Sequence, residues 1–329
     1  MPDQAMPKPV TPAQSQHQVT GDGPSGRPGA GQTQPAAQPT PAQQTTAQQA
    51  TAGPAKQPEE RYFQRFTVKQ RWSHAIMLTT FLGLAATGLS ILFSSNAWAQ
   101  RFAALVGGFD AILFLHKLCA VTLTAVFLYH VYDLMVRIFI KKEKGILWGP
   151  TSMVPNLKDL KHMIGNFRWF LGLGPKPTAE RYAYWEKFDY WAVFWGMVII
   201  GSSGYVMWFG PFFGRFLPGW ALNAVQIVHG EEALLAITFI FSIHFFNSHG
   251  RPDCFPMDTT IFTGVASEEE FKQRHLDEYQ RLAAEGKLEE KLTVKPQPGF
   301  VTFAKVMGFT AVFIGLVLFV LTVRAYFRI

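Results

Sequence analysis

Five apolar stretches, each about as long as a membrane span, follow the first sixty residues of this chain. A helix needs about 20 predominantly apolar residues to cross the hydrocarbon core of a bilayer. The stretches are Trp72–Phe93, Ala111–Ile140, Phe188–Phe209, Leu222–Phe246 and Val301–Tyr326. Phenylalanine accounts for 30 of the 329 residues, which is unusual for a soluble protein. The sequence therefore predicts an all-α integral membrane protein with five transmembrane helices.

The first 60 residues carry almost no large apolar side chains and are rich in Pro, Gln, Ala, Thr and Gly. Such a segment cannot bury enough surface to offset the entropy lost on ordering. It also has no charged segment followed by an apolar run, so it does not resemble a secretory signal. We expect a disordered cytoplasmic tail.

The distribution of Lys and Arg predicts the orientation of the spans, because cytoplasmic loops are enriched in these residues. Four basic residues precede the first span: Arg61, Arg65, Lys69 and Arg71. Between the second and third spans lie Lys141, Lys142, Lys144, Lys158, Lys161, Arg168, Lys176, Arg181 and Lys187. After the fourth span come Arg251, Lys272 and Arg274. The alternate loops contain only Arg101 and Arg215. We expect a bacterial inner-membrane protein with a cytoplasmic N-terminus and a periplasmic C-terminus, although Arg324 and Arg328 then lie on the less common side. The net charge of +7 is a topology signal, and no nucleic-acid partner is expected.

Two pairs of histidines lie inside the second and fourth apolar stretches. His116 and His130 form one pair, and His229 and His244 form the other. At about 1.5 Å per residue each pair spans roughly 21–23 Å and lies on nearly one helix face. Polar side chains at such depths are costly and usually functional. Both spans run outward to inward, so the pairs place two imidazoles near each membrane face. Paired imidazoles are the axial ligands of b-type haem, and the pattern predicts two haems stacked across the bilayer.

The two cysteines narrow the choice of redox cofactor. Cys119 and Cys254 provide neither a CxxCH motif for a c-type haem nor the four thiolates of an iron–sulfur cluster. Any redox cofactor must therefore be held without covalent attachment, and imidazole is the available ligand.

The inner side of the membrane has more histidines than one haem needs. His74 opens the first span level with His130 and His244, so His74 and His130 compete to partner His244. His249 lies five residues after His244 and is expected in a loop. A third haem on the spare histidines is a minor alternative. Interfacial histidines that bind no haem are the other alternative, and they leave the matched depths unexplained.

Three stretches of the chain resemble a known family. The first span resembles that of the gamma subunits of membrane-bound formate dehydrogenases, in RFTVKQRWSHAIMLTTFLGLAATGL with its Thr-Gly end. The second and fourth spans are similar to those of cytochrome b/b6-domain proteins, in LHKLCAVTLTAVFLYHVYDL and VHGEEALLAITFIFSIHFFNSHGRPDCFPMDTTIFTG. The resemblance covers about Arg61 to Tyr279. It implies a four-helix dihaem cytochrome b, with the outer haem on His116 and His229 and the inner haem on His74 and His244. His130 departs from the formate dehydrogenase pattern and offers His244 a second partner.

Quinone chemistry moves protons as well as electrons, so a titratable side chain is expected beside one haem. On the outer side the candidates are Glu231 and Glu232, which otherwise form a solvated helix start. On the inner side they are His249, Asp253 and Asp258. The sequence does not decide on which side of the membrane the quinone site lies, or whether the quinone is menaquinone or ubiquinone.

The expected function is that of an electron-transfer subunit in a quinone-linked respiratory oxidoreductase. The chain has no fold for molybdenum, nickel or flavin chemistry, so a molybdoenzyme, iron–sulfur or multihaem c cytochrome subunit is the expected catalytic partner. The basic, aromatic loop Lys141–Lys187 is expected to dock a cytoplasmic subunit or to lie on anionic headgroups. A haem-free proton-coupled transporter with a His/Glu relay is the alternative from another class, and a purely structural anchor is the third.

These expectations divide the chain into four parts. Residues 1–60 form the tail, 61–250 the four-helix haem-binding bundle, 251–299 a cytoplasmic loop and 300–329 the fifth span. The loop contains a charged helix from Ser267, where Ser267 and Glu270 suit a capping box and His275 is expected to be solvent-exposed. The fifth span has no haem-ligand candidate, and a packing or partner-contact role is expected for it.

Overall fold

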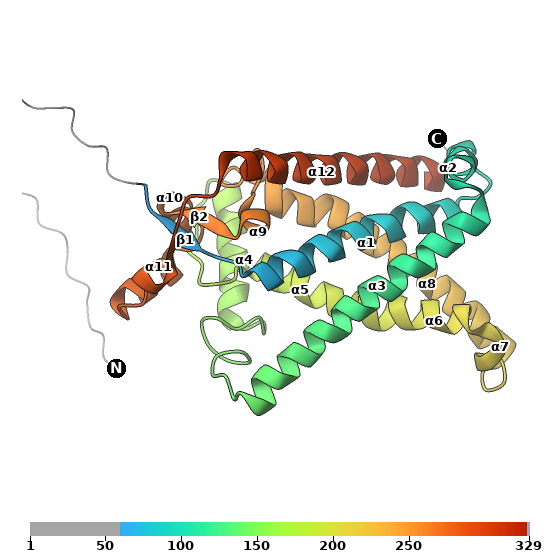
Figure 1. Ribbon diagram of the computed structural model, residues 1–329, viewed down its shortest axis with the longest axis horizontal. Helices are drawn as coiled ribbons and strands as arrows, with labels where there is room; N and C mark the ends of the chain where they lie inside the picture. Colours follow the sequence, from blue (N-terminus) through green and yellow to red (C-terminus); the bar gives the residue numbers. More distant parts are fainter. Residues whose placement is uncertain (1–59, 328–329) are drawn as a thin grey trace, which may run out of the picture. The chain divides into compact units, whose positions relative to one another are not determined.

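Five long apolar helices dominate the computed structural model, which describes residues 60–327 (Figure 1). Those able to cross a membrane are Val68–Leu92, Phe109–Ile140, Tyr184–Trp208, Gly219–Gly250 and Pro298–Phe327. The prediction of five helices long and apolar enough to cross a membrane is confirmed, and each helix begins a few residues before the predicted start. The predicted tail lies outside the described residues, apart from Glu60.

The spans are built from the following elements. They are α1 (Val68–Leu92), α3 (Phe109–Met135) with the π-helix η2 (Val136–Ile140), α5 (Tyr184–Gly196), η3 (Met197–Gly201), α6 (Ser202–Trp208), α8 (Gly219–Phe239), η4 (Ile240–His244), η5 (Phe246–Gly250) and α12 (Pro298–Phe327). Shorter helices are α2 (Ala97–Val106), α4 (Leu157–Phe170), α7 (Gly210–Phe213), α9 (Thr260–Thr263), α10 (Glu268–Arg274), α11 (Leu276–Ala284) and η6 (Glu289–Lys291). The strands are β1 (Tyr62–Gln64), β2 (Val265–Ser267) and β3 (Leu292–Thr293).

Two helix pairs form the bundle. α1 packs along α3, and α8 packs against α5 and α6, while contacts of α1 with α8 and of α3 with η3 join the two pairs. The buried cluster between them contains Ala85, Leu89, Ile237, Phe241, Phe245 and Leu318. Leu318 belongs to α12, which packs against α1 and η4. The fifth span is therefore part of the packed bundle.

A seam of small residues seats α12 on the bundle. Its buried residues recur every third or fourth position, at Ala304, Gly308, Ala311, Gly315, Leu318 and Thr322. Small residues let membrane helices approach closely and gain van der Waals contact. A Cβ added at Gly315 would lie 2.6 Å from Phe245 and 2.7 Å from Phe241. The position therefore has no room for a side chain.

The variant Gly315→Leu is expected to lower the thermal stability of the detergent-solubilised protein. The added side chain must displace Phe241 or Phe245, and overpacking of this kind typically costs about 1–3 kcal/mol. Thermal unfolding followed by circular dichroism measures the effect. Gly299→Leu is the matched control, because nothing lies within 4 Å of a Cβ at Gly299. Equal melting temperatures for the two variants would contradict this packing.

The fourth span continues further than expected. His249 was predicted in a loop, but it lies in the π-helix η5, which ends at Gly250. The prediction was wrong because the wider turns of η4 and η5 carry the helix through Asn247 and Ser248 before Arg251 adopts an extended conformation. His244 and His249 thus share one continuous span.

A small sheet with two short helices forms a cap at the end of the bundle where α1 begins. β1 is the central strand and pairs antiparallel with both β2 and β3. The predicted single charged helix is two helices, α10 and α11, which meet at His275. The capping box is confirmed, because Ser267 Oγ accepts from Glu270 N and the Glu270 carboxylate accepts from Ser267 N. We call these three strands and two helices the cap, and this end of the bundle the cap end.

A buried ion pair joins the cap to the bundle. Arg65, which follows β1, donates to Glu278 on α11, and both side chains are about 95% buried. Arg181, in the segment before α5, lies 3.8 Å from the other carboxylate oxygen of Glu278 and also donates to the Arg65 carbonyl. The Glu278 carboxylate therefore pairs with the guanidinium groups of both Arg65 and Arg181.

The variant Glu278→Ala is expected to destabilise the cap by about 3–5 kcal/mol, because Arg65 is left buried and uncompensated. Hydrogen exchange of peptides from α10 and α11 should accelerate accordingly. Glu285→Ala is the control, since Glu285 is itself exposed at the end of α11 and the loss of its ion pairs should change exchange little. Unchanged protection in Glu278→Ala would rule out a stabilising role for the pair.

His275 is half-buried at the joint of α10 and α11, and its Nδ1 donates to the carbonyl of Glu180 at 2.7 Å. The prediction of a solvent-exposed side chain was wrong, because the segment before α5 covers this joint. Burial, followed by the charge of Arg65, lowers the pKa of His275 well below its usual value.

The cap is expected to lose stability as the pH falls below about 6.5. The unfolded chain binds a proton at His275 near that pH, whereas the folded chain does not until a lower pH, so protonation favours unfolding. Hydrogen exchange of α10 and α11 at pH 7.5 and 5.5, corrected for intrinsic exchange rates, measures the loss. His275→Gln should show a smaller pH dependence, and an equal dependence in both proteins would contradict the assignment.

Candidate functional site

His116 and His229 face each other near the end of the bundle that holds α2 and α7. His116 lies in the second turn of α3 and His229 in the middle of α8. The centres of the two imidazole rings are 6.4 Å apart, and the ring planes meet at 73°. The structure thus brings together the two residues predicted to ligate one haem.

The separation of the rings suits a bridging metal ion. A ring nitrogen lies about 1.1 Å from the ring centre, and a metal–imidazole bond measures about 2.0–2.1 Å. A metal ion in line between two imidazoles therefore places the ring centres about 6.2–6.4 Å apart. A direct hydrogen bond of about 2.9 Å between the rings would bring the centres to about 5.1 Å. The observed 6.4 Å between the ring centres leaves room for the first arrangement and is too long for the second.

The Nδ1 atom of each ring is already occupied. Thr87 Oγ1 lies 2.9 Å from His116 Nδ1, and this hydroxyl donates its own hydrogen to Gly83 O at 2.6 Å. His229 Nδ1 lies 3.0 Å from the carbonyl of Ile200, a group that can only accept. Both Nδ1 atoms therefore carry the proton, and both Nε2 atoms are left as bare lone pairs, the form that binds a metal.

Each histidine also lies against a glycine that follows a hydroxyl residue. A Cβ added at Gly88 would lie 3.2 Å from His116 Cε1, and one added at Gly204 would lie 3.1 Å from His229 Cε1. Gly88 follows Thr87, and Gly204 follows Ser203, whose Oγ lies 3.1 Å from His229 Nδ1. Sequence reasoning noted the Thr-Gly end of the first span but missed Ser203-Gly204. A hydroxyl–glycine dipeptide in both the first and third spans was the available signal.

A π-helical segment helps to position the second of these partners. η3 (Met197–Gly201) ends two residues before Ser203, and it contains the Ile200 carbonyl that accepts from His229. π-Helical turns are rare and often occur at functional sites. The third span thus departs from α-helical geometry where it contacts His229.

The second group of histidines lies toward the cap end. His244, the last residue of η4, has its Nδ1 2.8 Å from Asp189 Oδ2 on α5. A carboxylate only accepts, so this Nδ1 also carries the proton and Nε2 is again left free. Sequence reasoning missed Asp189, although a lone acidic residue inside the apolar third span was a signal.

His74 and His130 have different surroundings. His74, on α1, is within electrostatic range of His244 and His249, and its ring packs edge-on against Phe262. His130, on α3, has its Nε2 2.9 Å from the hydroxyl of Tyr190. The structure therefore brings His74 toward His244, while the Nε2 of His130 is engaged by α5.

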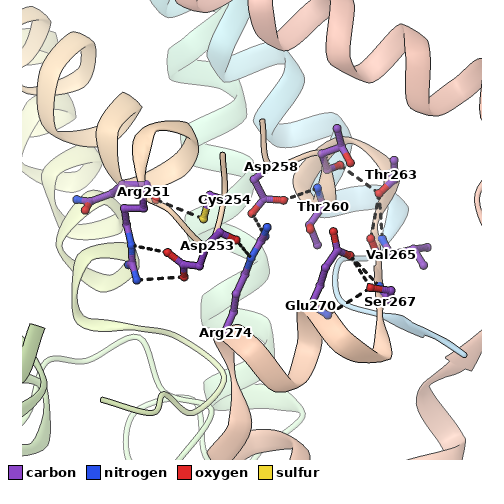
Figure 2. Close-up of polar contacts among 12 residues, drawn as sticks. Arg251, Asp253, Cys254, Asp258, Thr260, Thr263, Val265, Ser267, Glu270 and Arg274 are labelled. Carbon is purple, nitrogen blue, oxygen red and sulfur yellow. Dashed lines mark hydrogen bonds and ion pairs between the residues drawn. The ribbon is translucent and has the colours of Figure 1, made fainter. Parts of the chain in front are cut away.

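The two candidate aspartates after the fourth span are held in ion pairs (Figure 2). Asp253 binds Lys176 at 2.8 Å and Arg251 at 3.2 Å, and Asp258 binds Arg274 at 2.5 Å. Burial alone would raise the pKa of Asp253, but the hydrogen bond from Lys176 and the charge of Arg251 hold it below its usual value. Both carboxylates serve to fold the loop, which weakens their candidacy as proton acceptors.

The candidates inside the fourth span are less constrained. Glu232 Oε2 accepts from the indole nitrogen of Trp195 at 3.1 Å, and Glu231 is exposed. His249 Nδ1 is buried and has no side-chain hydrogen-bond partner within residues 60–327. Glu231, Glu232 and His249 therefore remain proton-binding candidates, the two glutamates near His229 and His249 near His244.

No group of three or more His, Cys, Asp or Glu side chains able to hold a metal ion occurs within residues 60–327. A haem supplies four nitrogen ligands itself and needs only two axial residues, so paired histidines fit it where a bare metal ion would lack ligands. A comparison with models of known protein families gave no match to this chain, and a search among curated proteins found no similar sequence either.

Proposed function

We propose that this protein is the membrane cytochrome b subunit of a quinone-linked respiratory oxidoreductase, similar to the gamma subunits of formate dehydrogenases. It carries electrons across the bilayer between a quinone pool and a partner redox subunit. Two b-type haems supply the electron-carrying chemistry when bound, each by cycling its iron between the ferric and ferrous states. His116 and His229 hold one haem, and His244 holds the other with His74 as its partner.

The observation that carries the proposal is the geometry of His116 and His229. Their ring centres have the separation of a bis-imidazole metal site, and both Nδ1 atoms are hydrogen-bonded so that Nε2 is the remaining ligand atom. Neither Nε2 atom has a hydrogen-bond partner within residues 60–327, so both are available as ligand atoms. Haem ligation satisfies both rings.

Quinone chemistry also requires proton-binding residues, a defined orientation and a partner subunit. Glu232, held by Trp195, and His249 are proposed to bind protons for quinone chemistry. We also propose that the cap end lies in the cytoplasm of a bacterial cell, because basic residues are concentrated in the segments near the cap and cytoplasmic loops are enriched in such residues. A molybdoenzyme, iron–sulfur or multihaem c cytochrome subunit is the proposed catalytic partner.

A haem-free proton-coupled transporter is the competing function. Asp189 bound to His244 and Glu232 bound to Trp195 place proton-binding groups inside apolar spans, as a proton relay requires. The metal-like spacing of His116 and His229 has no role in such a relay.

A spectrum of the purified protein decides between these functions. Protein made in cells with adequate haem supply should show b-type bands in the dithionite-reduced minus oxidised spectrum. A haem assay should give two haems per chain, and a quinol analogue should reduce them. Protein that folds and contains no haem would overturn the proposal and leave the transporter function standing.

A further inference from the structure

We infer that Asp189 sets the reduction potential of the haem held by His244 below that of the haem held by His116 and His229, so that the bundle has a low-potential site toward the cap end. The inference rests on the proposed function and adds a direction to it.

The hydrogen-bond acceptors of the three ligands differ in charge. His116 donates to the hydroxyl of Thr87 and His229 to the carbonyl of Ile200, both of which are neutral. His244 donates instead to the carboxylate of Asp189 at 2.8 Å. The two histidine groups therefore have different electrostatic environments at the atom next to the ligating nitrogen.

Asp189 forms no ion pair with a lysine or an arginine within residues 60–327. The nearest lysine in sequence, Lys187, is paired with Asp159 at 2.9 Å. The second oxygen of Asp189, Oδ1, is buried and has no hydrogen-bond partner within the described part of the chain. The side chain is 18% exposed, so little water reaches it. The carboxylate therefore acts mainly on His244.

A carboxylate that accepts from a metal-bound imidazole raises the basicity of that ligand. In apolar surroundings a nearby negative charge also interacts strongly and favours the more positive of two metal states. Both effects stabilise ferric over ferrous iron at His244 and lower the potential there. A neutral hydroxyl or carbonyl acceptor has no comparable effect at His116 or His229.

A lower potential at His244 makes the cap end the electron-donating end of the bundle. Electrons from a quinol, which also releases two protons on oxidation to the quinone, then move favourably toward the α2–α7 end. The acceptor is a protein of higher potential at that end. Because the positive-inside rule places the cap in the cytoplasm, the direction is outward across the membrane.

An optical redox titration of the purified protein tests the inference. The wild-type protein should show two haems with distinct potentials. In Asp189→Asn the amide oxygen still accepts from His244, but the charge is gone, so the lower potential should rise while the upper one stays. A tenfold change in the relative stability of ferric and ferrous iron corresponds to about 59 mV. Repeating the substitution in a His116→Ala background, which should keep only the haem at His244, assigns the shifted haem.

Two variants serve as controls. Asp189→Glu retains the charge and should keep the lower potential near its wild-type value. Ser203→Ala removes a hydroxyl at 3.1 Å from His229 but leaves the Ile200 carbonyl, and it should not move the lower potential. If Asp189→Asn moves neither potential, or moves only the upper one, the inference is wrong while the proposed function stands. If the wild-type protein contains no haem, the proposed function itself fails.

A second measurement uses the wild-type protein alone, and it tests the effect of Asp189 on His244 even if Asp189→Asn does not retain haem. In the oxidised wild-type protein the two haems should show different near-infrared charge-transfer energies by magnetic circular dichroism, because the His244 ligand has more imidazolate character. Two bands of the same energy would overturn the inference.

Discussion

The variant His229→Ala should contain one haem per chain where the wild-type protein contains two. His229 is one of two imidazoles whose centres lie 6.4 Å apart, and no other histidine is in contact with this pair in the described structure. The remaining haem should be the one at His244, which lies about 22 Å further along the same helix by its rise per residue. Electron transfer across the bilayer should be abolished, because the carrier toward the α2–α7 end is missing. A haem assay and quinol-driven reduction of an external acceptor measure the two effects.

The glycine beside His229 offers a second test of this site, and another glycine in the same span provides its control. Gly204→Leu should also lose this haem, because a Cβ there lies 3.1 Å from His229 Cε1 and a larger side chain must displace the ring. Gly196→Leu lies in the same span, where a Cβ only reaches ordinary contact with Ile200 Cδ1 at 3.8 Å, and both haems should be retained. If His229→Ala and Gly204→Leu both keep two haems, His229 is not a ligand.

The spans and the His116–His229 pair could be predicted because they depend on local properties of the sequence. A run of about 20 apolar residues specifies a transmembrane helix almost regardless of its neighbours. A histidine inside such a run is costly in free energy unless it has a partner, so its presence alone indicates a functional site. Matched depths on two spans were then sufficient to pair His116 with His229.

The residues that hold the ligands in place could not be predicted in the same way. Asp189 and Ser203 lie on the third span, and their contacts with His244 and His229 depend on how that span is rotated against α8. The π-helical segments η3 and η4 change this rotation, and neither has a sequence signal comparable to a hydrophobic run. The sheet of the cap depends on pairing β1 with β2 across some two hundred residues, which local patterns do not specify.

The second large effect is expected at His74. His74→Ala should remove the haem held by His244 and leave the haem at His116 and His229, because α1 brings His74 within electrostatic range of His244. His130→Ala should keep both haems. The Nε2 of His130 is bonded to Tyr190, and its ring packs edge-on against Phe194, so its loss removes a contact between α3 and α5 and no ligand.

The two single variants discriminate between two arrangements of the second haem. If His130→Ala loses a haem and His74→Ala does not, both haems are held between the second and fourth spans alone, and the Tyr190 contact must break when the haem binds. If both variants keep two haems, His249 is the remaining candidate partner, because it lies within electrostatic range of His244. The double variant His74→Ala/His249→Ala then has to lose the haem. The ligand identified in this way also decides whether α1 supplies an axial ligand, because His74 is the candidate ligand on the first span.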